Sequence, residues 1–289
     1  MTQQDLEGKV LDNCNLWFET YGERRLQEKS SVLLLHGFTG SHLTWKRLCG
    51  KLSKEHYFLI TPDLPGHGRS ERAALPASKD LTIDATSDIL QNLLDVLDVG
   101  KTALLGYSLG GRIALNFALK HQERLTCLIL ESASPGIQDP EEREKRKMED
   151  DSLAKELENN GLAWFVNRWE NLGLFATQKD LDPKTFEIVR RERLSHTASG
   201  LAMSLRSAGT GTMEPLWSQL GRLAIPVLLI AGEKDEKFLT IGEEMVKRMP
   251  SNCTLSVMKN SGHAPHLENP DFFEETVKQF LDGIYKNRS

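Results

Sequence analysis

Short apolar segments recur along the chain and alternate with longer segments of mixed polarity. Most of these segments are continuous apolar runs, which is typical of strands buried on both faces of a parallel sheet. We therefore predict strands at residues 31–37, 57–63, 101–108, 125–132, 225–233 and 253–263.

Between the predicted strands, apolar residues recur with the spacing that places them on one face of a helix. Residues 82–99 and 110–122 show this pattern. Residues 269–286 add an amphipathic helix with Pro270 near its first turn, where proline is favoured. The alternation of strand and helix predicts an α/β protein with a doubly wound, mostly parallel sheet.

Residues 136–220 break this alternation. They are helical in pattern, charged and poor in strand signals, yet they lie between two predicted strands. We predict that they form a helical cap, inserted into a core made of residues 1–135 and 221–289. Within the cap, residues 141–151 mix positive and negative charges at helical spacing, which favours a solvated helix face. Single arginines in this run can still point inward.

Composition narrows the classes of function. The chain has 289 residues and a net charge of −5, so charge gives no argument for binding nucleic acid or an anionic membrane. No apolar run is long enough to span a membrane, and residues 1–16 lack the features of a signal peptide, so we expect a cytoplasmic protein. Cys14, Cys49, Cys127 and Cys253 are far apart, which indicates reduced, mostly buried thiols rather than a zinc site or a disulfide framework.

Residues 106–110, GYSLG, match the G-x-S-x-G nucleophile elbow, with a predicted strand before it and a predicted helix after it. The turn is too tight for side chains at its flanks, and Gly106 and Gly110 remove that obstacle. Ser108 is then exposed at the carboxyl end of its strand. Its backbone lies at a helix N-terminus, where free N–H groups attract negative charge.

A serine hydroxyl needs a histidine to activate it, and the histidine needs a carboxylate to orient it. In the α/β-hydrolase fold these residues follow the chain order Ser, Asp, His. Asp235 follows one predicted strand and His263 follows the next, so both lie at carboxyl ends of strands, where open α/β sheets build their sites. We predict a catalytic triad of Ser108, Asp235 and His263.

Other residues compete for these roles. His266 is the second candidate base, although its position just before LENP favours a loop-fixing or pocket-lining role. Glu131 could be the acid in a variant arrangement, but the strand before Asp235 stands directly before that of His263. The remaining histidines are most simply surface or structural residues: His42, His56, His67, His121 and His196.

Backbone amides complete the candidate site. The fold's oxyanion hole uses the amide after the serine, here that of Leu109, and one from the loop after the first strand. That loop is HGFTG (36–40), so Phe38 supplies the second amide and His36 braces the loop. The Gly-rich segment 63–70 lies on the same rim, but neither phosphate-binding glycine pattern is present, which argues against a nucleotide site.

Arg112 follows Ser108 by one helical turn and lies on roughly the same face. A cation near a helix N-terminus opposes the helix dipole and costs about 0.3–1 kcal/mol. Two explanations stand: a salt bridge to a nearby carboxylate, or a substrate carboxylate bound beside Ser108.

The cap offers further candidates for an anionic pocket. Its aromatic residues at helical spacing belong to a core more often than to a ligand site. The candidate cations are Arg143, Arg146, Arg168, Arg190, Arg191 and Arg193, and the candidate pocket walls are Trp164, Phe165, Trp169 and Phe175.

Several motifs together point to one family. They include GYSLGGRIAL (106–115), LILESASPGI (128–137), WFVNRWENLGLF (164–175), RERLSHTASGLAMSLRSAGTGTMEPLW (191–217), GEKDEKF (232–238) and GHAPHLENP (262–270). From about residue 30 onward, the chain resembles the 2-succinyl-6-hydroxy-2,4-cyclohexadiene-1-carboxylate synthase family of the α/β-hydrolase superfamily.

The resemblance implies a lyase of menaquinone biosynthesis. Such an enzyme eliminates pyruvate from 2-succinyl-5-enolpyruvyl-6-hydroxy-3-cyclohexene-1-carboxylate. Ser108, tuned by His263 and Asp235, would abstract a ring proton as a base and form no acyl-enzyme. The resemblance implies neither a metal nor an organic cofactor, and we expect a monomer or a homodimer that binds a small tricarboxylate.

The same resemblance assigns the substrate-binding residues. Arg112, Arg146 and Arg193 would bind the three carboxylates, although Arg143 is near enough to replace Arg146. Tyr107 and Trp169 match pocket positions of the family.

Two other hypotheses use the same motifs. A serine hydrolase of an ester or a C–C bond would share the elbow, the triad and the oxyanion loop, but it would have no need for three cations. A non-catalytic protein that kept the fold would be expected to have a broken triad, and this triad is complete.

Overall fold

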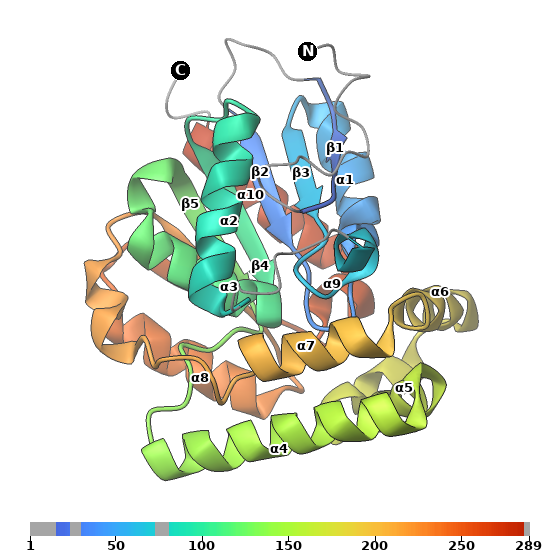
Figure 1. Ribbon diagram of the computed structural model, residues 1–289. Helices are drawn as coiled ribbons and strands as arrows, with labels where there is room; N and C mark the ends of the chain where they lie inside the picture. The colour runs from blue at the N-terminus through green and yellow to red at the C-terminus, as the bar shows by residue number, and fades with distance from the viewer. Residues whose placement is uncertain (1–15, 24–29, 73–80, 286–289) are drawn as a thin grey trace.

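The computed structural model describes residues 16–23, 30–72 and 81–285, so the expectations for Cys14 and for the N-terminal segment lie outside it. A seven-stranded sheet in the order β1-β3-β2-β4-β5-β6-β7 forms the centre (Figure 1). Among the described strands, β1 alone is antiparallel to its neighbour. The strands are β1 (Phe18–Tyr21), β2 (Ser31–Leu35), β3 (Phe58–Pro62), β4 (Thr102–Tyr107), β5 (Leu125–Glu131), β6 (Val227–Gly232) and β7 (Cys253–Met258).

Helices cover both faces of the sheet, which confirms the doubly wound α/β-hydrolase fold. One face carries α2 (Ile83–Val96), α3 (Leu109–Lys120) and α8 (Glu236–Arg248), and the other carries α1 (Lys46–Leu52) and α10 (Pro270–Tyr285). Apart from the helices between β5 and β6, the other elements are short: η2 (His42–Trp45), η3 (Ser53–Glu55), η4 (Gly68–Arg72), η5 (Gln122–Arg124), η6 (Gly173–Asp180), η7 (Trp217–Arg222) and α9 (Pro265–Glu268).

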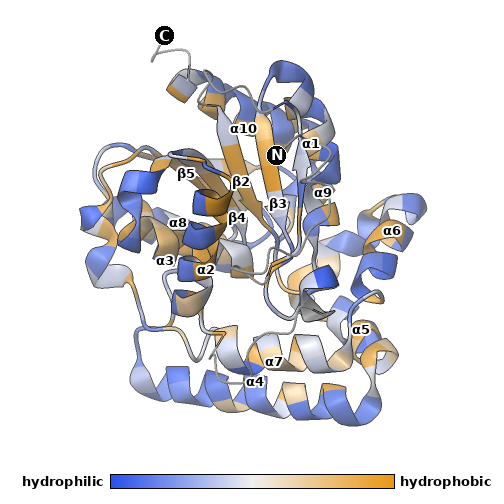
Figure 2. Cartoon of the chain, turned by 45° about the horizontal axis from the view of Figure 1, so that its top comes forward, coloured by the Kyte–Doolittle hydropathy of each residue, from blue (hydrophilic) through white to orange (hydrophobic). Residues whose placement is uncertain are grey.

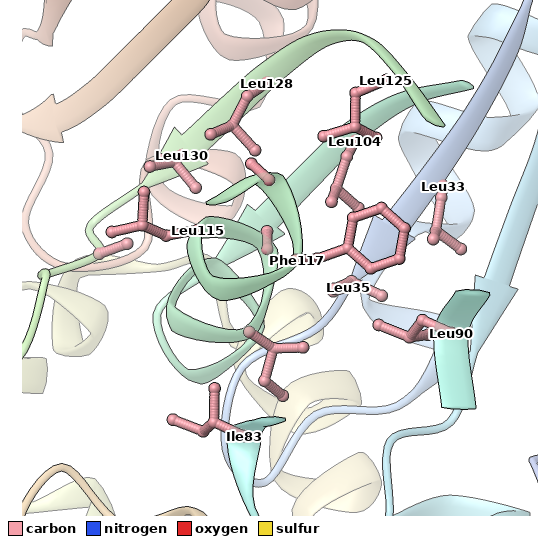
Figure 3. Close-up of a cluster of buried hydrophobic side chains, with 14 of the residues drawn as sticks. Leu33, Leu35, Ile83, Leu90, Leu104, Leu115, Phe117, Leu125, Leu128 and Leu130 are labelled. Carbon is pink, nitrogen blue, oxygen red and sulfur yellow. The ribbon is translucent and has the colours of Figure 1, made fainter. Parts of the chain in front are cut away.

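Successive residues of a strand point to opposite faces, so each continuous apolar run feeds two cores. Leu33, Leu35 and Leu104 lie on the face of α2 and α3, where Phe117 packs among them (Figure 3). Their neighbours Val32 and Leu34 belong to the core on the opposite face. This arrangement explains why the buried strands show no polar alternation.

The ends of the sheet differ from the sequence prediction. The strand β1 was not predicted, because only four residues pair there, at the edge of the sheet. The last strand was predicted to reach residue 263, but β7 ends at Met258. Asn260 then adopts a positive φ of 58°, which turns the chain out of the sheet and leaves His263 in a loop.

The segment between β5 and β6 is helical, as predicted. It contains α4 (Pro140–Asn160), α5 (Leu162–Glu170), α6 (Pro183–Arg193) and α7 (Ala198–Ala208). Figure 1 shows α7 between α4 and the core of the molecule. A small apolar cluster, which includes Leu157, Phe165 and Leu201, joins α4, α5 and α7. We keep the name cap for residues 136–220, and its extent as a separate unit stays a prediction.

The charged run 141–151 lies on α4, which is largely hydrophilic along its length (Figure 2). Most of its residues are exposed or partly exposed, as expected for a solvated helix face. Asp150 is the exception, because its side chain is buried against the rest of the cap.

A substitution at Gly110 would test how tightly the elbow packs against β2. A Cβ atom there would lie 2.4 Å from the carbonyl oxygen of Leu35 and 2.5 Å from that of His36. Because both atoms belong to the backbone, we expect Gly110→Ala to lower the free energy of unfolding by about 1–3 kcal/mol, measured by urea denaturation. The control is Gly50→Ala in α1, where a Cβ meets nothing within 4 Å. That change should stabilise the protein by about 0.5–1 kcal/mol, and equal effects at both positions would contradict the argument.

Candidate active site

Ser108 occupies the sharp turn between β4 and α3. Its φ of 50° and ψ of −106° are unusual for a residue with a side chain. The amide of Ser108 donates to the carbonyl oxygen of Glu131 at 2.9 Å, which ties the turn to β5. A Cβ at Gly106 would lie 2.4 Å from the carbonyl oxygen of Gly110, so the turn requires glycine there, as the sequence indicated.

The structure brings Ser108, His263 and Asp235 together. The Nε2 atom of His263 lies 3.1 Å from the Ser108 hydroxyl, and its Nδ1 atom lies 2.7 Å from Oδ2 of Asp235. Asp235 is held in turn, because its Oδ1 atom accepts the amide of Phe238 at the start of α8. With its proton on Nδ1, the His263 ring donates to the carboxylate and presents a free lone pair to the serine.

The side chains of His266 and Glu131, the alternative candidates for base and acid, contact each other. Oε1 of Glu131 accepts both the amide of His266 at 2.9 Å and its Nδ1–H at 2.8 Å. Both side chains are buried, and the His266 ring packs edge-on against Tyr107 at 4.7 Å between centroids. This pair fixes the loop after β7, so the geometry favours His263 and Asp235 as base and orienting acid.

The two residues predicted to supply the oxyanion amides, Phe38 and Leu109, lie at the cavity that contains Ser108. Leu109 is the first residue of α3, and amides of the first helical turn have no acceptor within their helix. His36 braces the loop: its Nδ1 donates to the carbonyl of Gly37 at 2.8 Å, and its Nε2 accepts the amide of Leu64 at 2.9 Å. Burial lowers the pKa of His36 to about 4, so the ring is neutral at physiological pH.

A cavity of about 210 Å³ opens onto these groups. Its walls come from the core and the cap and are mostly apolar, but they include three cations. The lining residues besides Ser108 and His263 are Phe38, Tyr107, Leu109, Arg112, Ser132, Ser134, Gly136, Ile137, Arg146, Asp150, Trp169, Leu174, Phe175, Ser204, Leu205, Ala208, Gly209, Thr210, Lys237, Phe238 and Ile241.

Arg112 faces this cavity. One guanidinium nitrogen, Nη1, donates to the carbonyl oxygen of Ala208 at the end of α7, at 2.8 Å. Burial and the nearby Arg146 lower its pKa to about 10, so it stays charged at neutral pH. Among the described residues, no carboxylate oxygen lies within 4.0 Å of the guanidinium. Within the described residues no direct salt bridge explains this cation, although Asp150 attracts it electrostatically, and this favours the explanation by a ligand carboxylate.

Arg146, rather than Arg143, lines the cavity. Its Nε atom donates to Oδ1 of Asp150 at 2.9 Å. Burial raises the pKa of Asp150, whose carboxylate also interacts electrostatically with Arg112. Arg143 instead donates to the carbonyl oxygen of Ile137 at 3.3 Å.

Arg193 does not line the cavity at Ser108 with Arg112 and Arg146. Its guanidinium donates to Glu170 at 3.2 Å and to Gln178 at 2.8 Å, and it lies over the ring of Phe175. It lines a smaller adjacent cavity of about 50 Å³, which shares Phe38, Tyr107 and Phe175 with the cavity at Ser108. Within the cap, the carboxylate of Glu170 forms an ion pair with Arg193. The sequence pattern did not connect these two residues.

Lys237 is the cation that sequence reasoning missed. It lies two residues after Asp235, in the first turn of α8, and lines the cavity at Ser108. The signal that singled out Arg112 applies here too, because Lys237 is also a cation at a helix N-terminus.

Comparison with known proteins settles the family. A family model described as the alpha/beta hydrolase fold matches residues 30–270. A Bacillus subtilis protein provisionally named 2-succinyl-6-hydroxy-2,4-cyclohexadiene-1-carboxylate synthase is 40% identical over 254 residues, which cover 88% of this chain and 91% of that protein. The chain belongs to this synthase family. The structure of MenH from S. aureus agrees, with a TM-score of 0.86 and 34% identity over 92% of this chain and 98% of that one.

The synthase family lies among hydrolases of the same fold. An esterase from Thermogutta terrifontis, solved with malate bound, has a TM-score of 0.77 and 26% identity, over 93% of this chain and 94% of that one. The fold and the elbow therefore do not separate a lyase from a hydrolase. The residues around Ser108 have to distinguish the two activities.

Some of the aromatic residues singled out in the sequence line the cavity, and others pack behind it. Tyr107 and Trp169 line the cavity, and the Trp169 ring stacks on Phe165 at 5.4 Å between centroids. Phe175 also lines it, whereas Trp164 lies under the guanidinium of Arg168.

Of the remaining histidines, His56 is exposed and others have structural contacts. His42 contacts Asp63 at 2.8 Å, and His121 contacts Asp88 at 3.2 Å. Cys49, Cys127 and Cys253 are buried, as expected.

Within the described ranges, no group of three or more His, Cys, Asp or Glu side chains could hold a metal ion. None of the helices described is long and apolar enough to cross a membrane.

Proposed function

We propose that the protein is a carbon–oxygen lyase of menaquinone biosynthesis, which converts 2-succinyl-5-enolpyruvyl-6-hydroxy-3-cyclohexene-1-carboxylate into 2-succinyl-6-hydroxy-2,4-cyclohexadiene-1-carboxylate and pyruvate. The observation that carries this proposal is the cationic wall beside Ser108. Arg112 and Arg146 face the cavity, and Arg112 has no carboxylate partner within salt-bridge distance among the described residues. A substrate with three carboxylates fits such a wall.

The chemistry follows from the substrate. The ring hydrogen beside the succinyl ketone is acidic, because its removal gives an enolate. The electron pair of that C–H bond forms a new ring double bond, the existing double bond shifts by one position, and the C–O bond to the enolpyruvyl group breaks. The leaving group takes up a proton and becomes pyruvate, so no water is consumed and no acyl-enzyme is needed.

The residues at the site have matching roles. Ser108 takes the ring proton as it passes its own hydroxyl proton to His263, and Asp235 holds the imidazole in the tautomer that accepts it. The amides of Phe38 and Leu109 stabilise the enolate oxygen of the succinyl group. Because the charge on that oxygen develops only during the reaction, these amides favour the transition state over bound substrate.

The carboxylates have distinct partners in this proposal. Arg112 and Arg146 hold two of them, and Tyr107 and Trp169 form the walls around the ring. Arg193 reaches the third carboxylate only if its guanidinium leaves Glu170 and Gln178. We further propose that the protein acts in the cytoplasm, as a monomer or a homodimer, on this small molecule alone and without a cofactor.

The direct test is to incubate the purified protein with the enolpyruvyl substrate. We expect pyruvate, measured by coupling to lactate dehydrogenase, to appear in equal amounts with the absorbance of the conjugated diene. The second candidate is a serine hydrolase, which the similarity to the esterase and the assembled triad favour. Rapid hydrolysis of p-nitrophenyl esters without pyruvate above background would support the hydrolase and reject the lyase.

A further inference from the structure

The loop that carries the second oxyanion amide has an unfavourable conformation. Residues 37–40 form a tight turn closed by a hydrogen bond from the amide of Gly40 to the carbonyl oxygen of Gly37, at 3.0 Å. Thr39 occupies the third position of this turn with a φ of 68°. Such a position normally takes glycine or asparagine, and a β-branched residue is rare there. The surroundings must therefore hold this turn, which sets the direction of the Phe38 amide.

The cap supplies one contact at the strained residue itself. His196, in the connection between α6 and α7, lies 2.9 Å through Nε2 from the carbonyl oxygen of Thr39. Its other ring nitrogen, Nδ1, accepts the amide of Gly68 at 3.0 Å. A backbone amide can only donate, so the proton of the ring is on Nε2 and is donated to Thr39. Burial lowers the pKa of His196, which keeps the ring in this neutral form.

A second cap residue holds the end of the same loop. Oε1 of Glu192, on α6, accepts the hydroxyl of Ser41 at 2.6 Å and that of Thr44 at 3.1 Å. The ring of Phe38 completes the contact, because it packs edge-on against Trp169 of α5 at 5.2 Å between centroids. Cap residues therefore touch the loop at Phe38, whose amide is the oxyanion donor, and after it at Thr39 and Ser41.

From these contacts we infer that His196 and Glu192 are positioning residues of the cap, which hold the turn at residues 37–40 so that the Phe38 amide faces the reacting oxygen. The cap would then do more than cover the substrate, because its contacts with the loop would also position one of the two amides of the oxyanion hole. The inference rests on the proposed function for the identity of the reacting oxygen, an enolate.

Two substitutions at His196 separate its two hydrogen bonds. In His196→Asn the amide oxygen can replace Nδ1 and keep the contact with Gly68, but the donor to Thr39 is lost. In His196→Gln the longer side chain can place an N–H near the position of Nε2 and keep that donor. We expect His196→Asn to lower kcat for pyruvate release by roughly ten- to a hundredfold with KM changed less than about twofold, and His196→Gln to recover most of the loss.

Matched variants guard against an unspecific effect. Glu192→Ala removes the other cap contact and should also lower kcat with little change in KM, which tests the loop even if a variant at His196 folds poorly. Arg206→Ala removes an ion pair within the cap, to Glu158, and should leave both constants unchanged. Thermal unfolding followed by circular dichroism shows whether each variant is folded under the assay conditions.

Three results would overturn the inference. They are wild-type kcat in both His196→Asn and Glu192→Ala, equal losses in His196→Asn and His196→Gln, and a rise in KM with kcat unchanged, which would leave the cap contacts a role in binding only. If the wild-type protein released no pyruvate, the proposed function would fail by itself. The same variants assayed on p-nitrophenyl acetate would then still test the loop, because ester hydrolysis uses the same oxyanion hole.

Discussion

Replacement of Ser108 by alanine is expected to lower kcat for pyruvate elimination by at least about a thousandfold. The substitution removes the hydroxyl that lies 3.1 Å from His263 Nε2 and leaves the cationic wall of the cavity in place. Loss of one triad member in serine hydrolases leaves only the catalysis due to the oxyanion hole and to binding. Steady-state release of pyruvate measures the loss of turnover, and calorimetry with the diene product should show binding changed by less than about threefold.

The control for this variant is Ser207→Ala. Ser207 lies on α7 outside the cavity, and its hydroxyl donates to the carbonyl oxygen of Met203. We expect wild-type turnover from it. Substantial activity in Ser108→Ala would show that His263 or water takes the ring proton directly. A covalent adduct on Ser108, found by mass spectrometry during turnover of the wild-type protein, would contradict the role of base.

Much of the site could be predicted because its signals are local. A G-x-S-x-G segment between strand and helix needs Gly106 because a Cβ there would meet the turn itself, whereas Gly110 is needed because β2 and the loop after it lie against it. Asp235 and His263 could be found because parallel strands end at the same edge of the sheet, so residues that follow two neighbouring strands meet there. Chain order and strand order were therefore enough to select three residues that the structure brings into contact.

The contacts that sequence reasoning did not anticipate depend on partners in other elements of the chain. Whether Arg193 faces the substrate cavity depends on Glu170 and Gln178, and no periodicity within α6 shows that these lie beside it. His196 was predicted to be a surface or structural residue, and the structure shows a buried structural role, but no local pattern shows that its ring donates to a carbonyl group 157 residues earlier. A pattern within one element reports which face is apolar, but it does not report which polar group of another element lies opposite.

The charges around the cavity explain why two arginines can lie so close to one another. Burial and, after it, the like charge of Arg146 lower the pKa of Arg112, because two nearby guanidinium groups repel each other. Asp150 reduces that repulsion, since its carboxylate is bonded to Arg146 and also attracts Arg112. A ligand carboxylate beside Arg112 would add a further favourable interaction without having to displace an existing ion pair.

Arg112 is therefore the residue whose loss should separate the two candidate functions. We expect Arg112→Ala to lower kcat/KM for the tricarboxylate by about a hundredfold, since a charge-assisted hydrogen bond is worth up to roughly 3 kcal/mol. Hydrolysis of a neutral p-nitrophenyl ester, if the protein catalyses it, should fall less than about threefold, because that substrate has no carboxylate to bind. Parallel steady-state assays of the two substrates measure both effects.

Two further variants sharpen this test. Arg112→Lys keeps the charge but not the planar pair of donors, so it should recover only part of kcat/KM. Arg143→Ala removes a cap arginine outside the cavity and should match the wild-type protein. Arg112 also bonds to the carbonyl oxygen of Ala208, so its loss could disturb the contact between α3 and α7 instead of substrate binding. In that case both activities would fall together, and the argument for an anionic substrate would lose its main support.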